Sequence, residues 1–462
     1  MKVTVISGSP KGEHSVTLRY LEYIKKRFPA HEYTVFHAGR DIRKIENDEE
    51  LFQSILEAVR RSDAVLWCFP VFYLCVPSPL KRFIELVFEH GKKEVFQGKY
   101  ASAVTTSGHF FDHVAHNYVH SVSEDLGMQY LKGFSAEMQD LLRPESRENL
   151  DNFAERFFRT AVEKQPLEKV FEPLKAGIPE YQPGEVAPSA KSGKWKVVLV
   201  TDAAGDDVNL KRMTDSFMAS LPNPVEVVNL NRILMKGGCL SCYQCGIDNV
   251  CVYDDDVGSI YREKLMKADA IVYAAGIRDR FFSSRMKMFW DRSFYLGHAP
   301  PLMGKQAAWI ISGPLRQIPD LRQMIESLME NCPMSLVGIV TDEYPASGEI
   351  TGLLENMGRE ILLAVERKIR RQPSFFGVGG HLLFRDLIYR GSYLFRADDR
   401  FYRKHGLYDY PQNNLGERLT SILLWNLTSI PAIRRKFFQG AFEKMLEPYK
   451  KLLKDVGPRQ GC

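Results

Sequence analysis

The sequence has no long apolar run. The longest candidate, Leu419 to Ile433, contains Asn426 and Pro431 and is shorter than the roughly 18 residues that a membrane-spanning helix needs. The first residues, MKVTVISGSPKG, lead directly into a strand and a turn, without the basic, apolar and cleavage regions of a secretory signal. These two absences predict a cytoplasmic protein. Hydrophobic and charged contents of 45% and 26% are typical of a globular chain with a sizeable core.

Cysteine is scarce, with 8 residues in 462, but half of the cysteines lie in one short stretch. They follow the spacing C-x2-C-x2-C-x5-C and are Cys239, Cys242, Cys245 and Cys251. Thiols of a cytoplasmic chain are expected to be reduced, so a cluster of them favours metal or redox chemistry over disulfides. One loop of this spacing can present four thiolates to an iron–sulfur cluster. A zinc site, which usually pairs two C-x2-C units across a longer gap, and thiols without a metal are the alternatives.

Strands and helices alternate along residues 1–165, starting with KVTVIS as a buried strand, and this pattern predicts a parallel sheet with helices on both faces. Closely spaced prolines between 166 and 194 then predict a linker. The plan repeats over 195–372. KVVLVTDAAG (196–205) overlays the first strand and its turn at an offset of 194, and three later segments overlay at an offset of 206. The extra residues of the second copy fall before its third strand, where the cysteines lie. We therefore predict two tandem doubly wound, five-stranded sheets, the second with a cysteine loop.

The loop after the first strand, GSPKGEHSVT (8–17), has the composition of an anion site. Its hydroxyl and cationic side chains are Ser9, Lys11, Ser15 and Thr17. They stand directly before a helix N-terminus, where backbone N–H groups and the helix dipole favour a phosphate. An ordinary helix-capping turn is the alternative, since Gly and Ser are common there. PVFYLCVP (70–77) and TTSGHFF (105–111) follow the third and fourth strands. Loops at the carboxyl ends of neighbouring strands converge on one crevice, so the three loops are expected to form a ligand site.

The segments GSPKGEHSVT, CFPVFYLCVPSPLKRFIE and TTSG resemble the flavodoxin-like NAD(P)H-dependent FMN reductases, and the resemblance covers residues 1–165. It implies FMN as the cofactor and NAD(P)H as an electron donor. It further implies an FMN phosphate at Ser9, Lys11, Ser15, Val16 and Thr17. The edge of the isoalloxazine ring is implied near Pro70, Val71, Phe72, Tyr73, Thr106, Ser107 and Gly108.

The second copy resembles the iron–sulfur flavoproteins of the same superfamily over about 195–370, through GC-x2-C-x2-C-x5-C, KADAIV and MKMFWDR. That resemblance implies a 4Fe–4S cluster on the four cysteines. The phosphate loop, however, has changed: Ala203 and Gly205 replace Ser9 and Lys11. Asp202, Asp206 and Asp207 crowd the same turn, and carboxylates repel a phosphate. We predict one FMN and one cluster per chain; a second flavin held by backbone amides is the alternative.

Four histidines lie in or directly after the loop that follows the fourth strand. His109 is predicted to donate a proton to the substrate and is the candidate catalytic residue. His113, His116 and His120 share one helix face, which indicates a solvated face or, with Asp112, a metal site.

Residues 373–462 match neither copy. From Glu366 to Cys462 there are 19 Lys and Arg against 9 Asp and Glu. The spacing of apolar residues predicts a helical extension that packs on the body of the protein. A lid, or a surface for an acidic partner or an anionic membrane, is the alternative, and nucleic acid is not expected because no recognised module is present.

The sequence thus predicts a flavin- and iron–sulfur-dependent oxidoreductase. Electrons would pass between NAD(P)H or a ferredoxin-type donor, the cluster and FMN, and would reduce a small aromatic, quinone-like or unsaturated substrate. Homo-oligomers are expected, as in the families that the chain resembles. An electron-transfer flavoprotein without a small-molecule substrate, or a zinc-binding redox-sensing protein, is the alternative.

Overall fold

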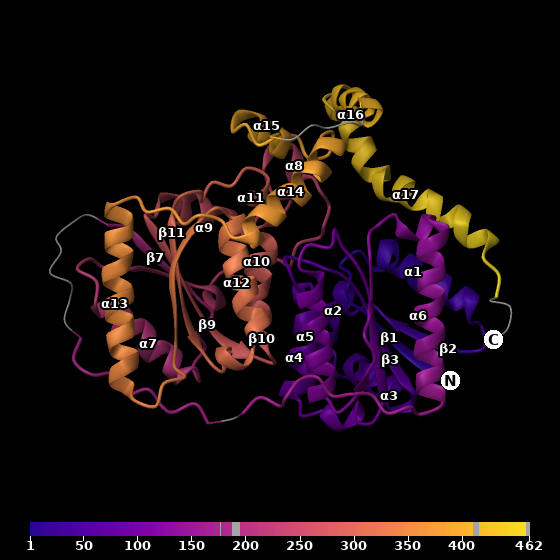
Figure 1. Ribbon diagram of the computed structural model, residues 1–462, viewed down its shortest axis with the longest axis horizontal. Coiled ribbons are helices and arrows are strands. Elements are labelled where there is room, and N and C mark those ends of the chain that lie inside the picture. The colour runs from indigo at the N-terminus through magenta and orange to yellow at the C-terminus, as the bar shows by residue number, and fades with distance from the viewer. Residues whose placement is uncertain (176, 187–194, 410–414, 459–462) are drawn as a thin grey trace. The chain divides into compact units, whose positions relative to one another are not determined.

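The computed structural model describes residues 1–175, 177–186, 195–409 and 415–458, so residues 176 and 187–194 of the predicted linker lie outside the described residues. The chain divides into two compact units. The first comprises Met1–Pro173, Gly238–Ser241 and Asn426–Cys462, and the second comprises Leu174–Gly237 and Cys242–Trp425. Each unit contains one parallel sheet flanked by helices (Figure 1).

The sheet of the first unit has the strand order β2-β1-β3-β4-β5, which is the flavodoxin-like order. Its strands are β1 (Lys2–Ser7), β2 (Glu32–Phe36), β3 (Ala64–Pro70), β4 (Tyr100–Thr106), β5 (Gln129–Tyr130) and β6 (Phe134–Ala136). Both β5 and β6 pair with β4, so the predicted fifth strand is broken into two short pieces. The helices of this unit are α1 (Val16–Arg27), α2 (Ala38–Asn47), α3 (Glu49–Arg61), α4 (Ser78–Glu89), α5 (Asp112–Asp125), α6 (Pro144–Val162) and α17 (Pro431–Asp455).

Apolar strands covered on both faces form the core of the first unit. The sequence of β3, AVLWCFP, is apolar at every position and is buried except at its last residue, as expected for a central parallel strand. One face of the sheet packs against α1 and α6, whose buried residues form a single cluster with those of β1, β3 and β4. Leu446, Tyr449 and Leu453 of α17 join this cluster. The apolar stripe of the last helix therefore belongs to the core of the first unit.

The second unit repeats the same order as β8-β7-β9-β11-β12, and this confirms the predicted fold class. Its strands are β7 (Val197–Thr201), β8 (Glu226–Asn229), β9 (Ala270–Arg278), β10 (Phe281–Phe282), β11 (Gln306–Ser312) and β12 (Ser335–Thr341). All neighbouring pairs are parallel except β9 and β10, which form a tight antiparallel hairpin. Helices in this unit are α7 (Val208–Ala219), α8 (Cys245–Asp248), α9 (Asp256–Glu263), α10 (Ser284–Arg292), α11 (Phe294–Gly297), α12 (Pro319–Asn331), α13 (Ser347–Glu366), α14 (Phe375–Arg390), α15 (Arg396–Lys404) and α16 (Leu415–Leu427).

The hairpin after the third strand has the same backbone in both copies. Tyr73 and Leu74 have φ values of 43° and 68°, and Asp279 and Arg280, their equivalents at the offset of 206, have 48° and 63°. Positive φ is unusual for residues other than glycine and is often found at functional sites. The two copies therefore share the conformation of this loop although most of its side chains differ.

A buried ion pair also occurs at equivalent positions of the two copies. Lys81 of α4 lies 3.2 Å from Glu85, and Lys287 of α10 pairs with Asp291. Each pair spans one helical turn, and all four side chains are at most 4% exposed. Helices at this place in the fold thus carry charges inside the protein, where each charge needs its partner.

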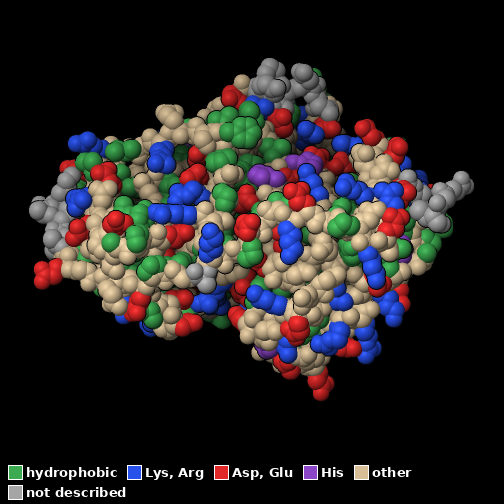
Figure 2. All heavy atoms as spheres, turned by 60° about the horizontal axis from the view of Figure 1, so that its bottom comes forward, with side chains coloured by type: hydrophobic (Ala, Val, Ile, Leu, Met, Phe, Trp, Pro, Cys, Tyr) green, Lys and Arg blue, Asp and Glu red, His purple; other side chains and the backbone are tan. Residues whose placement is uncertain are grey.

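The helical extension is anchored on the second unit at the start of α14. Glu330 of α12 accepts hydrogen bonds from the backbone N–H groups of Ser374 and Gly377 at 2.9 and 2.8 Å. Among the described helices, none is both long and apolar enough to cross a membrane. On the face drawn in Figure 2, basic and acidic side chains are interspersed over the surface.

Candidate functional site

The three predicted ligand-binding loops of the first unit start at one edge of its sheet. In the strand register Ser7 of β1 is level with Cys68 of β3, and Pro70 of β3 with Thr106 of β4. The backbone N–H of Gly8 donates to the carbonyl of Cys68 at 2.8 Å, and that of Val71 donates to Thr106 at 3.0 Å. The carboxyl ends of β1, β3 and β4 therefore hold the three loops side by side, as the sequence predicts.

The loop 8–17 ends in a helix N-terminus that its own side chains do not cap. Ser15 stands at the N-cap of α1, but its buried hydroxyl makes no capping hydrogen bond. The first N–H groups of a helix have no intrahelical partner, so this end of α1 is suited to an anion. Thr17 in the first turn is fixed by a 2.6 Å hydrogen bond between its hydroxyl and that of Thr106. Ser9, whose hydroxyl accepts from the N–H of Lys11 at 3.3 Å, is buried in the same loop.

Two residues of α2 border this loop and were not predicted from the sequence. A β-carbon on Gly39 would lie 2.3 Å from the carbonyl carbon of Gly8, so only glycine lets α2 approach the loop so closely. The Cδ atom of Arg40 lies 2.8 Å from the place that a β-carbon on Gly12 would take. Arg40 also pairs with Asp41 at 2.8 Å. No helix is predicted over residues 38–47 from the sequence, so the sequence offers no reason to place a second cation beside Lys11.

The loops that follow β3 and β4 are strained. Phe72 and Cys75 exchange backbone hydrogen bonds of 2.7 and 3.1 Å around Tyr73 and Leu74, which both have positive φ. In the second loop His109 also has positive φ, at 61°. Such backbone costs energy and persists where the surrounding fold holds it in place.

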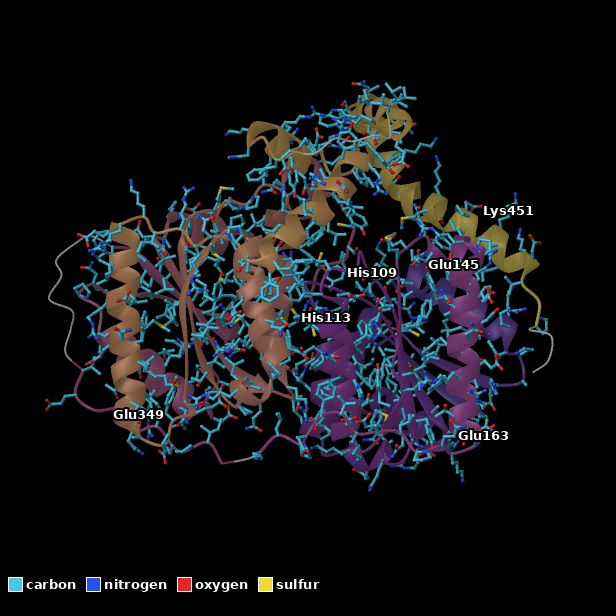
Figure 3. The ribbon with its side chains drawn as sticks, in the orientation of Figure 1. His109, His113, Glu145, Glu163, Glu349 and Lys451 are labelled. Carbon is cyan, nitrogen blue, oxygen red and sulfur yellow. The ribbon has the colours of Figure 1, made fainter. Side chains whose placement is uncertain are left out.

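His109, which Figure 3 labels, is held by a local hydrogen-bond network. Its Nδ1 atom lies 2.9 Å from Asp112, and the hydroxyl of Ser135 donates to the same carboxylate at 2.6 Å. Burial raises the pKa of Asp112, but these hydrogen bonds outweigh it and bring the pKa below its ordinary value. Asp112 is thus a carboxylate that favours a proton on Nδ1 of His109. The imidazole itself is 45% exposed, so Nε2 remains accessible.

The other histidines of α5 differ in their partners and in their burial. Nε2 of His116 lies 2.8 Å from the hydroxyl of Thr105, and burial lowers the pKa of this histidine to about 4. His120 lies 2.9 Å from Glu124 and stacks on Tyr130. The prediction of one solvated histidine face is therefore wrong for His116 and His120. Sequence spacing placed them on one side of the helix, but neighbouring elements cover that side. His113 at the start of α5 is exposed.

The cysteine loop has a strained backbone as well. Ser241, Tyr243 and Asn249 all have positive φ, between 54° and 64°. Cys245 begins the short helix α8 and is buried, whereas the other three cysteines are partly exposed. In the described ranges, no three His, Cys, Asp or Glu side chains are gathered closely enough to hold a metal ion. The donor set, four thiols within thirteen residues, fits a thiolate-ligated cluster in its chemistry.

A buried ion pair in the second unit contacts residues that precede the four cysteines in the sequence and residues that follow them. Arg292 of α10 forms a bidentate salt bridge with Asp255, with N–O distances of 2.6 and 2.9 Å, and both side chains are at most 1% exposed. Asp255 also accepts from the N–H of Lys236 at 2.9 Å, and Arg292 donates to the carbonyl of Gly237 at 3.2 Å. These contacts join residues before and after the cysteines, and the role of Arg292 was not predicted.

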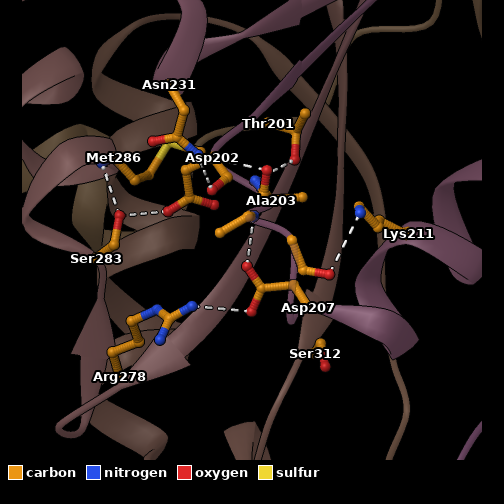
Figure 4. A network of polar contacts seen from close by, with 12 residues as sticks. Thr201, Asp202, Ala203, Asp207, Lys211, Asn231, Arg278, Ser283, Met286 and Ser312 are labelled. Carbon is orange, nitrogen blue, oxygen red and sulfur yellow. Dashed lines mark hydrogen bonds and ion pairs between the residues drawn. The ribbon is translucent and has the colours of Figure 1, made fainter.

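The turn that corresponds to the phosphate loop in the second copy is filled by its own side chains (Figure 4). Asp207 accepts a 2.7 Å hydrogen bond from the N–H of Ala204 and a 3.0 Å hydrogen bond from Arg278. Asp202 is buried and accepts from the hydroxyl of Ser283, while its Oδ1 atom has no hydrogen-bond partner among the described residues. Carboxylates thus occupy the place where the first copy offers N–H groups and hydroxyls.

We expect Asp202 to make the second unit less stable as the pH rises. Burial raises the pKa of Asp202 from 3.8 to about 6, so the folded state binds a proton that the unfolded state has released between these values. The stability that this group contributes is complete below about pH 4 and is lost by about pH 6 and above. Asp202→Asn should therefore raise the free energy of unfolding at pH 7 by up to about 3 kcal/mol.

Denaturant titrations of Asp202→Asn and the parent between pH 4.5 and 7.5 would measure this difference, which should grow with pH. Asp206→Asn, at an exposed position of the same turn, is the matched control and should change little. A difference independent of pH would contradict the assignment.

Comparison with known proteins supports the resemblance drawn from the sequence. Residues 1–139 match the family model of NADPH-dependent FMN reductases. An iron–sulfur flavoprotein of Archaeoglobus fulgidus is 24% identical to this chain over 208 residues, which are 43% of this chain and 93% of that protein.

Solved structures with a similar fold each cover about a third of the chain. The NAD(P)H:(acceptor) oxidoreductase FerB of Paracoccus denitrificans is 17% identical, with a TM-score of 0.29, and covers 35% of this chain and 97% of its own. An NAD(P)H:quinone oxidoreductase of Methanothermobacter marburgensis is 16% identical, with a TM-score of 0.25, and covers 37% and 98%.

Proposed function

We propose that this protein is an FMN- and iron–sulfur-dependent oxidoreductase in which the two copies have divided the cofactors. The observation that carries the proposal is the contrast between their first turns. The loop 8–17 presents an uncapped helix N-terminus with buried hydroxyls, whereas Asp207 fills the equivalent turn of the second copy. Only the second copy has the four cysteines. One flavin and one cluster per chain agree with this division.

The first unit would hold FMN through residues that the fold brings to one edge. Ser9, Lys11, Ser15, Val16 and Thr17 would bind the phosphate, with Arg40 as an additional cation beside the loop. The strained loops would bind the ring edge, through Pro70, Val71, Phe72, Tyr73, Thr106, Ser107 and Gly108. When bound, FMN can accept or give electrons in pairs or one at a time. It can therefore connect NAD(P)H, which transfers two electrons, with an iron–sulfur cluster, which transfers one, in the reduction of one substrate.

His109 would exchange a proton with the substrate. Asp112 accepts the Nδ1 proton of the imidazole, which leaves Nε2 as the atom that can hold or release a proton at the substrate. Ser135 holds the carboxylate in turn at 2.6 Å, so the ring orientation is set by two elements of the first unit. Small, reducible molecules of the aromatic, quinone-like or unsaturated type are the proposed substrates.

Cofactor analysis of protein purified without oxygen tests the proposal. We expect about one FMN and about four iron atoms per chain, and oxidation of NAD(P)H when a quinone is supplied as the acceptor. Two FMN per chain would contradict the loss of the second flavin site. Zinc in place of iron would remove the cluster from the proposal. Both cofactors without turnover of any small acceptor would favour an electron-transfer protein.

Lys11→Ala is expected to weaken FMN binding by about ten- to a hundredfold, because a charge-assisted hydrogen bond to phosphate contributes roughly 1.5–3 kcal/mol. Fluorescence titration of flavin-free protein with FMN would measure the change. Lys211→Ala is the matched control: it removes a lysine from α7, next to the equivalent turn of the second copy, where no flavin is proposed. Equal effects of the two substitutions would contradict the assignment of the phosphate to the first unit.

A further inference from the structure

A histidine and an aspartate outside the cysteine loop form a chain of contacts to Cys245. The Sγ atom of Cys245 lies 3.2 Å from Nε2 of His298, and Nδ1 of the same ring lies 2.7 Å from Oδ2 of Asp398. All three residues are buried. They come from α8, from the end of α11 and from α15, so 53 residues separate the cysteine from the histidine and 100 separate the histidine from the aspartate.

The contact between Nδ1 of His298 and Asp398 determines which ring nitrogen faces the sulfur of Cys245. A buried carboxylate beside Nδ1 accepts the proton of that nitrogen and fixes the plane of the ring. Nε2 is then directed at the cysteine, and no rotation of the ring exchanges the two nitrogens without breaking the 2.7 Å contact. Carboxylates commonly orient metal-ligating histidines through the second ring nitrogen in this way. Here the oriented histidine contacts a proposed cysteine ligand instead of the metal.

The helical extension is built closely around the same cysteine. A β-carbon on Gly246 would lie 2.3 Å from the carbonyl oxygen of Leu394, so glycine is needed for α8 to approach the segment before α15. Arg400 of α15 donates to the carbonyl of Ile247 at 2.7 Å. The rings of Tyr243 and Phe395 meet edge to face with centroids 5.9 Å apart. Asp398 thus reaches His298 from a helix that several independent contacts hold against α8.

We propose that His298 is a positioning residue: when Cys245 becomes a ligating thiolate, Nε2 of His298 takes the proton that the thiol gives up and donates it as a hydrogen bond to the sulfur. Helix α15 is part of the cysteine site because Asp398 accepts from Nδ1 and orients this histidine. The proposal rests on the proposed cluster for its consequence. An N–H group directed at a ligating sulfur withdraws electron density from it and favours the reduced cluster. Residues 373–462, which match neither copy, thereby gain a function: α15 adjusts the electron affinity of the cluster.

The first test is the reduction potential of the reconstituted cluster, followed optically during an anaerobic redox titration. His298→Ala should make the cluster harder to reduce by about tenfold in the equilibrium constant, since one hydrogen bond contributes on the order of a factor of ten. His298→Gln, whose amide N–H takes the place of Nε2–H, should restore most of the loss. Asp398→Ala should shift the equilibrium in the same direction as His298→Ala, and Asp398→Asn, which still accepts from Nδ1, should shift it less. A purely structural role would not give this order.

His405→Ala is the control, because His405 directly follows α15 at an exposed position and its ring contacts that of Phe401. An unchanged potential in His298→Ala, or an equal shift in His405→Ala, would overturn the proposal. If His298→Ala fails to fold, the comparison of His298→Gln with Asp398→Asn and the parent decides it.

A second measurement on metal-free protein separates this proposal from the proposed cluster. Alkylation by iodoacetamide, mapped by mass spectrometry, would compare Cys245 with Cys242 and Cys251 in the same molecule. An imidazole partner activates a thiol, so His298→Ala should slow alkylation of Cys245 by about tenfold and leave the other two unchanged. If the parent binds no iron but shows this selective effect, the cluster is wrong and the contact stands. If all three cysteines respond alike, the contact is wrong whatever metal is bound.

Discussion

Replacing Cys242 by serine is expected to lower the iron content of the reconstituted protein from about four atoms per chain to less than about one, because a 4Fe–4S cluster is held by all four thiolates. The cysteines supply every protein ligand in this proposal, and serine offers a much weaker donor of the same size. Iron and sulfide analysis after anaerobic reconstitution measures the loss. The broad absorption of the cluster should disappear with it.

Cys332→Ser is the matched control, because Cys332 caps the end of α12 and lies outside the cysteine loop. It should retain the iron of the parent. Full iron and sulfide in Cys242→Ser would show that the loop does not hold the cluster. Flavin content should not change in either variant, because FMN is assigned to the first unit.

Lys287→Met is expected to destabilise the second unit by about 3–5 kcal/mol, because it leaves the buried carboxylate of Asp291 without its paired charge. Lys287→Met combined with Asp291→Leu removes both charges and should recover most of the loss, since a buried ion pair can be replaced by apolar side chains at little net cost. Denaturant unfolding of the two variants and the parent would measure both values. A loss in the double variant as large as in the single one would show that the charges have other roles.

Lys81→Met provides the corresponding test in the first unit. Glu85 also lies 3.4 Å from Arg82, so it keeps a cationic neighbour after the substitution. We therefore expect a loss at the low end of the same range. Because the chain has two units, the unfolding of each must be followed by its own signal rather than by one two-state fit.

Local patterns account for the parts of the fold that were predicted correctly. Continuous apolar strands such as β3 indicated a doubly covered parallel sheet, and the strand order follows from the short crossovers between them. The break in the fifth strand was not predicted, because the apolar signal ends at Leu131 and the three residues of β6 are too few to show the pattern of a strand. α2 was also missed, since it follows β2 directly and contains Gly39, a poor helix former.

In the candidate site, the positions of the loops were predicted from the sequence, but the contacts between distant side chains were not. Loops that follow strands could be assigned to one sheet edge, and the structure brings them together there. The carboxylates of the equivalent turn in the second copy predict that it binds no phosphate, and in the structure Asp207 accepts a hydrogen bond from the N–H of Ala204. Arg40, Asp112, Arg292 and His298 were not given these roles. Each acts through a contact whose partner depends on how separate elements pack.

By itself the sequence determined what lies within one element or one loop: the repeat, the fold class, the cysteine spacing and the composition of the anion loop. These follow from periodicity and short-range chemistry, which are written in neighbouring residues. Only the tertiary structure decided which distant side chains meet, such as Asp398 with His298 and His298 with Cys245. No local pattern encodes such contacts, because they form only when the helices of the extension close over the loop and exclude water from the charges they bring together.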